Sequence, residues 1–113
     1  MEPETKLGKI KSVEFGLGGY QDAMLGIHFQ LGGDSWGVGS SKSQWDAQLI
    51  KCSDHCKWTE EDRSKAYDEI MRYVSKLLSD AKVPNVDKLE GIPVEVTFEG
   101  GCLKDWRILT EVL

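Results

Sequence analysis

Residues 25–31 read Leu-Gly-Ile-His-Phe-Gln-Leu, and the strict alternation of apolar side chains in this stretch decides the fold class. Successive side chains of a β-strand point to opposite faces of the sheet, so the four apolar residues share one face. Gly26, His28 and Gln30 share the other face. The stretch therefore predicts a strand with one buried face, which needs a second apolar layer to cover it.

The segments around this strand predict further antiparallel strands. Residues 10–15 predict a strand in which the spacing of the apolar side chains slips by one residue, as a β-bulge or the start of a strand would produce. Residues 16–22, Gly-Leu-Gly-Gly-Tyr-Gln-Asp, supply a hairpin turn and do not match the glycine pattern of a phosphate-binding loop. A second turn at 32–35 leads into a short strand around 36–38, and residues 47–51 are compatible with one more.

The stretch 59–82 predicts one long helix. Thr59 precedes three acidic residues at 60–62, so its hydroxyl can cap free N–H groups while the carboxylates face the positive end of the helix dipole. Pro84 disfavours helical geometry in the preceding residue and ends the helix near Lys82. Apolar side chains recur along the stretch at helical spacing and predict one buried stripe: Ala66, Ile70, Val74, Leu77 and Ala81.

A second hairpin closes the chain. Residues 92–98 alternate apolar and polar side chains, residues 99–101 (Glu-Gly-Gly) form the turn, and residues 103–113 run back. The order of these elements favours an antiparallel sheet with the helix across one face.

We therefore expect an α+β fold: a single domain over residues 1–113, with an antiparallel sheet of four to five strands and one long helix (about 59–82) packed on one face. Residues 1–7 are expected to form a flexible N-terminal extension. The helix should present Ile70, Val74 and Leu77 to the sheet. The sheet side chains expected to face them are Ile27, Phe29, Val94, Val96 and Ile108.

Composition and charge exclude several classes of protein. The chain has 113 residues, of which 40% are hydrophobic and 29% charged, as in an ordinary globular domain. Fourteen Lys and Arg residues against 19 Asp and Glu give a net charge of −5, which speaks against direct nucleic-acid binding. No apolar run approaches the length of a membrane span, and the polar start lacks the core of a signal peptide. We expect a soluble cytoplasmic protein without a membrane partner.

The sharpest local feature is Cys-Ser-Asp-His-Cys at residues 52–56. Cys52, His55 and Cys56 are ligand types that zinc prefers, but no second ligand pair stands at a recognisable spacing. We expect no metal and no other cofactor; if zinc is bound, these three residues are its first ligands. A fourth ligand would then come from elsewhere in the fold: His28, Asp54 or Cys102.

The same segment raises the question of thiol catalysis. Cys56 lies near the start of a helix, whose dipole would lower the pKa of a thiol. His55 is poorly placed as its base, because nucleophile and base usually come from separate segments that meet in space. Three cysteines in a chain without a signal peptide favour free thiols over a disulfide framework. We expect no catalytic residue.

Aromatic residues give the best candidates for a binding surface. Tryptophan, tyrosine and arginine dominate binding hot spots, and the chain has four tryptophans. Trp36 and Trp58 are expected to pack under the junction of sheet and helix. Trp45 stands in a polar stretch and is the candidate exposed anchor, beside the Gly-rich hairpin. The predicted binding residues are Trp45, Tyr20, Asp22 and Trp36.

Four segments resemble a family of small proteins of tailed bacteriophages and prophages. They are Phe-Gly-Leu-Gly-Gly-Tyr-Gln-Asp-Ala-Met-Leu-Gly (15–26), Trp-Thr-Glu-Glu-Asp-Arg (58–63), Pro-Val-Glu-Val-Thr-Phe-Glu (93–99) and Trp-Arg-Ile-Leu-Thr-Glu-Val-Leu (106–113). The likeness spans roughly residues 8–113. No activity or catalytic residue is established for the family, so the resemblance implies expression from a phage genome in a bacterial cytoplasm.

Three functions follow as hypotheses from these observations. The first is a non-catalytic phage protein that inhibits or modulates a host macromolecule, such as a bacterial defence system, in the manner of an anti-CRISPR or other anti-defence protein. The alternative is an accessory protein of phage DNA recombination or replication. The third is a small metal- or thiol-dependent enzyme. The expected partner is a host or phage protein, and a homodimer is allowed for.

Overall fold

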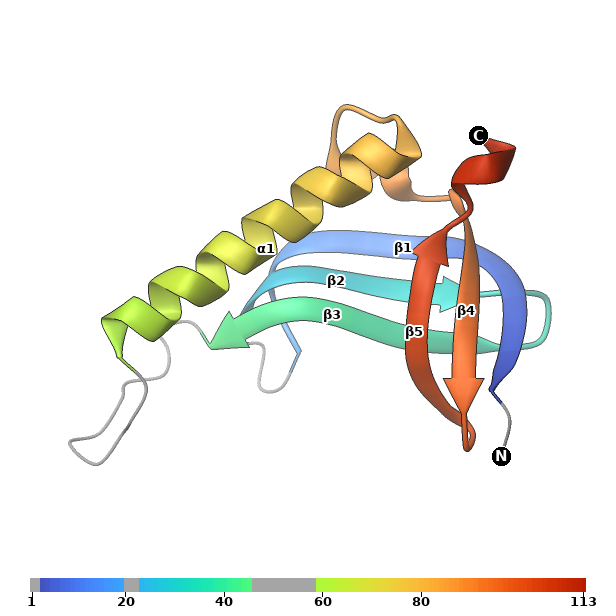
Figure 1. The fold of residues 1–113 in the computed structure, drawn as a ribbon, viewed down its shortest axis with the longest axis horizontal. Coiled ribbons are helices and arrows are strands. Elements are labelled where there is room, and N and C mark those ends of the chain that lie inside the picture. Colours follow the sequence, from blue (N-terminus) through green and yellow to red (C-terminus); the bar gives the residue numbers. More distant parts are fainter. Residues whose placement is uncertain (1–2, 20–22, 46–58) are drawn as a thin grey trace.

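The computed structural model describes residues 3–19, 23–45 and 59–113. These residues form one five-stranded antiparallel sheet and one long helix, which confirms the predicted α+β class (Figure 1). None of the described helices has the length and apolar character needed to cross a membrane. The elements in chain order are β1 (Glu4–Gly18), β2 (Met24–Gly32), β3 (Gly37–Trp45), α1 (Glu60–Ala81), the 3-10 helix η2 (Val86–Leu89), β4 (Pro93–Glu99), β5 (Cys102–Ile108) and the 3-10 helix η3 (Thr110–Val112).

Strand β1 belongs to both halves of the sheet. The strand order is β3-β2-β1-β4-β5, and every neighbouring pair is antiparallel. Residues 4–9 of β1 pair with β4, and residues 9–18 pair with β2. The register shifts between Ile10 and Ser12, which confirms the predicted bulge. A bulge bends its strand, so β4 and β5 run across the direction of β2 and β3 (Figure 1).

Three boundaries differ from the prediction. The chain enters the sheet at Glu4, so residues 4–7 pair with β4 instead of forming a flexible extension. Strand β3 continues to Trp45 because its polar residues pair with β2 along their whole length. Strand β5 ends at Ile108, and η3 replaces the end of the expected returning strand. The short strand considered at 47–51 lies outside the described residues.

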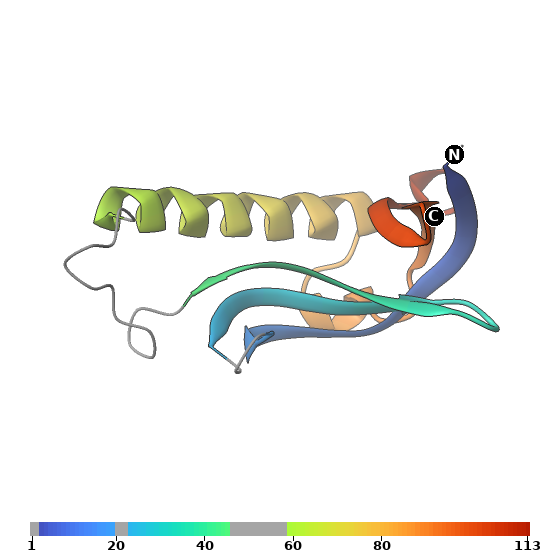
Figure 2. The ribbon, with the colours of Figure 1, turned by 90° about the horizontal axis from the view of Figure 1, so that it is seen from below.

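Helix α1 and the β4–β5 hairpin together cover one side of β2 and β3, which we call the inner face (Figures 1 and 2). Ile70, Val74 and Leu77 of the helix are buried in the core, as predicted. The hairpin contributes Trp106, whose ring meets Phe29 edge to face with centroids 5.1 Å apart. The predicted sheet residues are also buried in this core: Ile27, Phe29, Val94, Val96 and Ile108.

Local signals place the helix ends. Thr59 accepts a hydrogen bond from the backbone N–H of Asp62, and the Asp62 carboxylate accepts one from the N–H of Thr59. This capping box satisfies two N–H groups that the first turn leaves free. These bonds hold the pKa of Asp62 below its ordinary value. At the other end Lys82 adopts left-handed backbone geometry and terminates the helix.

Trp36 is partly buried against the core, and its ring contacts lie at the bend of β1. Its ring meets Phe98 edge to face at 5.6 Å, and the ammonium of Lys6 lies 6.0 Å from the ring centroid. A Cβ at Gly8 would lie 2.8 Å from the Trp36 ring, so glycine is required where the two halves of the sheet approach. Trp58, the second tryptophan predicted to pack at the junction, lies outside the described residues.

Candidate protein-interaction surface

Only two of the four predicted binding residues fall within the described residues, and these two are far apart. Trp36 stands before β3 and packs on the inner face against Phe98. Trp45 ends β3, about 30 Å further along at the rise of an extended strand. Tyr20 and Asp22 lie outside the described residues. The structure therefore does not join Trp36 and Trp45 into one patch.

The side of β1, β2 and β3 opposite the helix, which we call the outer face, carries small and polar residues. Alternation along each strand and the register of the ladders define its membership. Gln44 is buried on the inner face, so its neighbour Trp45 points outward. The outer face consists of Ser12, Glu14, Gly16, Gly18, Met24, Gly26, His28, Gln30, Gly39, Ser41, Ser43 and Trp45.

Trp45 stands at one end of this face. It is paired with Met24, which is paired in turn with Gly18, so the three residues form a row across the strands. Trp45 is 37% exposed, enough for its ring edge to contact another molecule while the rest packs on the protein. Trp45 is thus accessible, and its role as an anchor stays a prediction.

His28 is fixed in the middle of the outer face by hydrogen bonds. Its Nδ1 lies 2.9 Å from the hydroxyl of Ser41, and its Nε2 lies 3.2 Å from the carbonyl oxygen of Met24. A Cβ at Gly18 would come within 3.1 Å of the imidazole ring. Glycine at that position lets the ring lie flat against β1. Both ring nitrogens are engaged, so these contacts fix the orientation of the His28 ring.

Two hollows mark the outer surface of β1 and β2. One, of about 220 Å³, is lined by Ser12, Glu14, Phe29, His28 and Gln30. The other, of about 330 Å³, lies at the bend of β1, where Lys9 and Lys11 border four glycines and Asp34. The outer surface is thus shallow and offers hydrogen-bonding groups rather than an enclosed reaction chamber.

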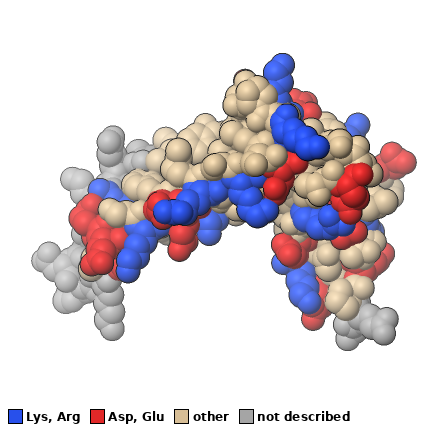
Figure 3. All heavy atoms as spheres, turned by 45° about the horizontal axis from the view of Figure 1, so that its top comes forward, with Lys and Arg blue, Asp and Glu red and all other residues tan. Residues whose placement is uncertain are grey.

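The fully charged residues lie mainly on other surfaces. Figure 3 looks onto α1 and the β4–β5 hairpin and shows basic and acidic side chains intermixed on both. They form ion pairs along the helix, such as Arg72 with Asp68 at 2.8 Å. On the hairpin, Arg107 pairs with Glu95 at 3.2 Å and with Glu111 at 3.0 Å. These hydrogen bonds raise the pKa of Arg107.

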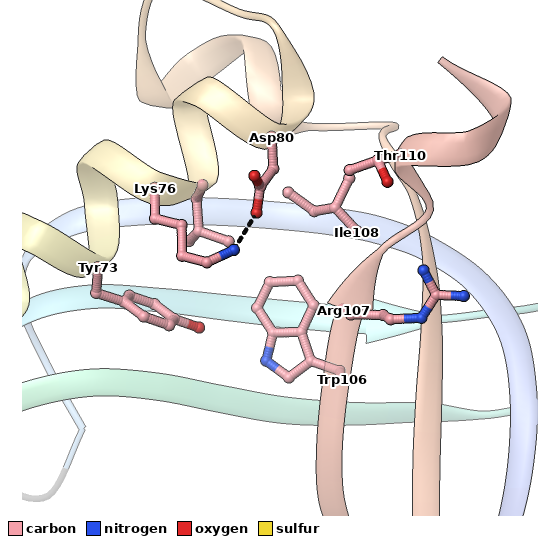
Figure 4. A pocket seen from close by; sticks show the side chains of 8 residues that line it. Tyr73, Lys76, Asp80, Trp106, Arg107, Ile108 and Thr110 are labelled. Carbon is pink, nitrogen blue, oxygen red and sulfur yellow. Dashed lines mark hydrogen bonds and ion pairs between the residues drawn. The ribbon is translucent and has the colours of Figure 1, made fainter.

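A cavity of about 390 Å³ lies between α1 and β5 (Figure 4). Lys76 and Asp80 close one side with an ion pair of 2.6 Å. Burial raises the pKa of Tyr73 to about 12, so its hydroxyl stays protonated near neutral pH. The guanidinium of Arg107 is held by its two carboxylate partners. Lys76 and Asp80 are therefore engaged with each other, and Arg107 is engaged with two carboxylates outside the cavity lining.

The metal and thiol hypotheses rest on residues outside the described part of the chain. Cys52, His55 and Cys56 all fall there. Within the ranges 3–19, 23–45 and 59–113, no three His, Cys, Asp or Glu residues gather as a metal site would require. Cys102 is a free, exposed cysteine at the start of β5.

The chain was compared with protein-family models, curated proteins and solved structures. None of them matches it. The resemblance to phage proteins therefore stays a prediction, and no activity is transferred from a relative.

Sequence reasoning missed the outer face as a surface, although part of its signal was visible. The alternation of residues 25–31 places Gly26, His28 and Gln30 outside. The serines of β3 give no comparable signal, because their strand follows from pairing with β2 and not from their own pattern.

Proposed function

We propose that the protein is a non-catalytic binding protein of phage origin that attaches to a host protein through its outer face. The observation that carries the proposal is the composition of that face. Among its residues only Glu14 carries a full charge, and the row at its end holds the partly exposed Trp45. The centres of protein interfaces are depleted in charged residues and enriched in tryptophan.

The phage resemblance favours a target in the host cytoplasm, and a bacterial defence system in particular. This step is an argument by association, of the kind that fold or family supports without proving. A net charge of −5 adds a physical reason, since an acidic protein is steered towards a basic groove on its partner. The proposed activity is inhibition by occupancy, as in anti-CRISPR or other anti-defence proteins, without turnover.

The test is capture of partners from a bacterial lysate, followed by affinity measurement with the captured protein. Trp45→Ala should weaken binding at least tenfold, about 1.4 kcal/mol. Ser41→Arg, which places a long charged side chain in the middle of the face, should weaken it as well. Met71→Ala is the matched control, because Met71 is an exposed apolar residue of α1, away from the outer face. Equal binding by Trp45→Ala and Ser41→Arg would remove the outer face from the site.

A second candidate is an accessory protein of phage DNA recombination or replication that binds single-stranded nucleic acid. Five antiparallel strands bent around a shared first strand, with the helix between the third and fourth, resemble the partly open barrel of oligonucleotide-binding folds. Those folds bind ligand across their second and third strands. Lys9 and Lys11 of β1 border a hollow beside the end of the second strand, next to that surface. The acidic net charge weighs against this candidate, so it takes second place.

Fluorescence polarisation with a labelled single-stranded oligonucleotide at low salt separates the two candidates. The first predicts no binding up to high micromolar protein. The second predicts salt-sensitive binding that Lys9→Gln and Lys11→Gln weaken. The third hypothesis, an enzyme, would be supported only by turnover of a substrate that Cys56→Ser abolishes.

A further inference from the structure

Two stretches of β1 have a sheet partner on a single side. Residues 4–8 pair with β4 alone, and Ile10 exchanges backbone hydrogen bonds with Gly91 and Ile92. Residues 12–18, which we call the open stretch, pair with β2 on one edge, and no other described strand pairs with their second edge. Alternate residues of the open stretch turn their backbone N–H and C=O groups to that edge, and these groups can pair with another strand.

The same stretch exposes apolar side chains on the inner face. Val13, Phe15 and Leu17 are paired with Phe29, Ile27 and Leu25, and so they point to the inner face. Phe15 and Leu17 are nevertheless about half exposed, at 49% and 50%, because α1 packs over β2, β3 and β5. An exposed strand edge beside exposed apolar residues is an interaction site.

Proteins protect free strand edges with lysine, proline or other charges, and the edges differ in this respect. The outermost strands are β3, which carries Lys42, and β5, which carries Lys104, Asp105 and Arg107. The one-sided first residues of β1 carry Glu4 and Lys6. Residues 12–18, Ser-Val-Glu-Phe-Gly-Leu-Gly, contain no proline and no basic residue, and Glu14 is their one charge. The open stretch of β1 is therefore the only one of these described edges without a lysine or arginine.

We propose that this edge joins two copies of the chain across a two-fold axis at Phe15. In an antiparallel pair centred there, Phe15 faces Phe15 of the second copy, Val13 faces Leu17, and Ser12 faces Gly18. The open stretch 12–18 is symmetric about Phe15, so this register pairs all seven residues of each copy. The inner faces of both copies stay on one side of the joined sheet, because paired residues share a face.

The two neighbouring registers of the strand pair, centred on Glu14 and on Gly16, are less favourable. One opposes two like charges, and the other pairs fewer residues of the open stretch. Centring the pair on Glu14 would place two carboxylates directly opposite each other, which is destabilising. Centring it on Gly16 would leave Val13 without a partner. In the proposed register Glu14 lies opposite Gly16, and nothing stands within 4 Å of the place where a Gly16 side chain would begin. The sequence of the stretch is thus complementary to itself, which an isologous two-fold contact requires.

The inference is independent of what the outer face binds. It predicts a continuous six-stranded sheet in which two outer faces lie side by side, each with its own Trp45. A protein of this kind would present its partner with two equivalent sites.

Sedimentation equilibrium of the full chain tests the proposal. The wild type should show twice the chain mass of 12.7 kDa. Because Phe15 faces itself, Phe15→Glu and Phe15→Lys should each give a folded monomer through like-charge repulsion, and an equimolar mixture of the two should recover the double mass. Leu7→Lys is the matched control, since Leu7 is an exposed residue of β1 outside the open stretch and a lysine there would lie opposite Glu95, and it should stay dimeric.

Circular dichroism of each variant establishes that loss of the dimer is not loss of the fold. A wild type that is monomeric at high micromolar concentration would overturn the proposal. Two folded charge variants that stay monomeric when mixed would overturn the register. A monomer that instead takes up an extended segment of another protein at this edge, blocked by Phe15→Glu, would replace the second copy with a different occupant.

Discussion

Gln44 lies on the inner face of β3, 7% exposed, and neither its side-chain oxygen nor its nitrogen has a hydrogen-bond partner among the described residues. A buried amide without partners costs free energy, because it loses its bonds to water. Replacing it with an apolar residue of similar length removes that cost.

We predict that Gln44→Met raises the free energy of unfolding by about 1–2 kcal/mol, which is of the order of the desolvation penalty of one such group. Urea unfolding followed by circular dichroism measures the change. Gln30→Met on the exposed outer face is the control and should stay within about 0.5 kcal/mol of the wild type. A loss of stability in Gln44→Met would mean that the amide is satisfied by residues beyond the described ranges.

Tyr73 gives a prediction about pH. Burial raises the pKa of Tyr73 to about 12 in the folded state, and the charge of Asp105 adds to the rise. The ordinary pKa of a tyrosine, which applies in the unfolded chain, is 10.0. The folded state thus holds the proton more tightly, so this contribution to stability is present below pH 10 and is lost as the pH rises towards 12. The wild type should lose stability across that window more steeply than Tyr73→Phe. Parallel slopes for the two proteins would contradict the assignment.

At the scale of the elements, α1 could be predicted almost to the residue and β3 could not. The helix carries its own signals in Thr59, Asp62 and the apolar stripe, and all of them act within a few residues. Strand β3 reads Gly-Val-Gly-Ser-Ser-Lys-Ser-Gln-Trp, without alternation, and it is a strand because β2 pairs with it. The first half of β1 likewise depends on β4, which is distant in sequence.

The buried stripe of α1 is the basis of a stability prediction. Ile70 and Val74 are buried against the sheet, so Ile70→Ala and Val74→Ala should each lower the free energy of unfolding by about 1–4 kcal/mol. Thermal and urea unfolding measure the loss. Met71→Ala, one position along the same helix but 60% exposed, should have little effect. Unchanged melting temperatures in both buried variants would show that the helix does not pack on this face.

At the scale of the molecule, the fold class and the buried core can be predicted from the periodicity of apolar residues in the sequence. The outer face and the open edge of β1 depend on how the strands are arranged in the sheet. Alternation in β2 already places His28 and Gln30 on the outside. The open edge at residues 12–18 could not be predicted in this way. Whether a strand edge is unpaired is known only when the pairing of all the other strands is known. No local pattern reveals that β4 stops at residue 9 of β1. The candidate site is therefore partly visible in the sequence, and the proposed contact between copies is visible only in the fold.

The shared strand β1 has a consequence for the order in which the protein is made. Residues 9–18 can form a hairpin with β2 as soon as both have been synthesised, since the two segments are close in the chain. Residues 4–9 must wait for β4, because Glu4 pairs with Phe98 near the other end of the chain. Closing so long a loop is slow relative to forming local hairpins. Residues 4–9 are thus synthesised well before the strand with which they pair, and until β4 follows, their edge is open to any extended chain nearby.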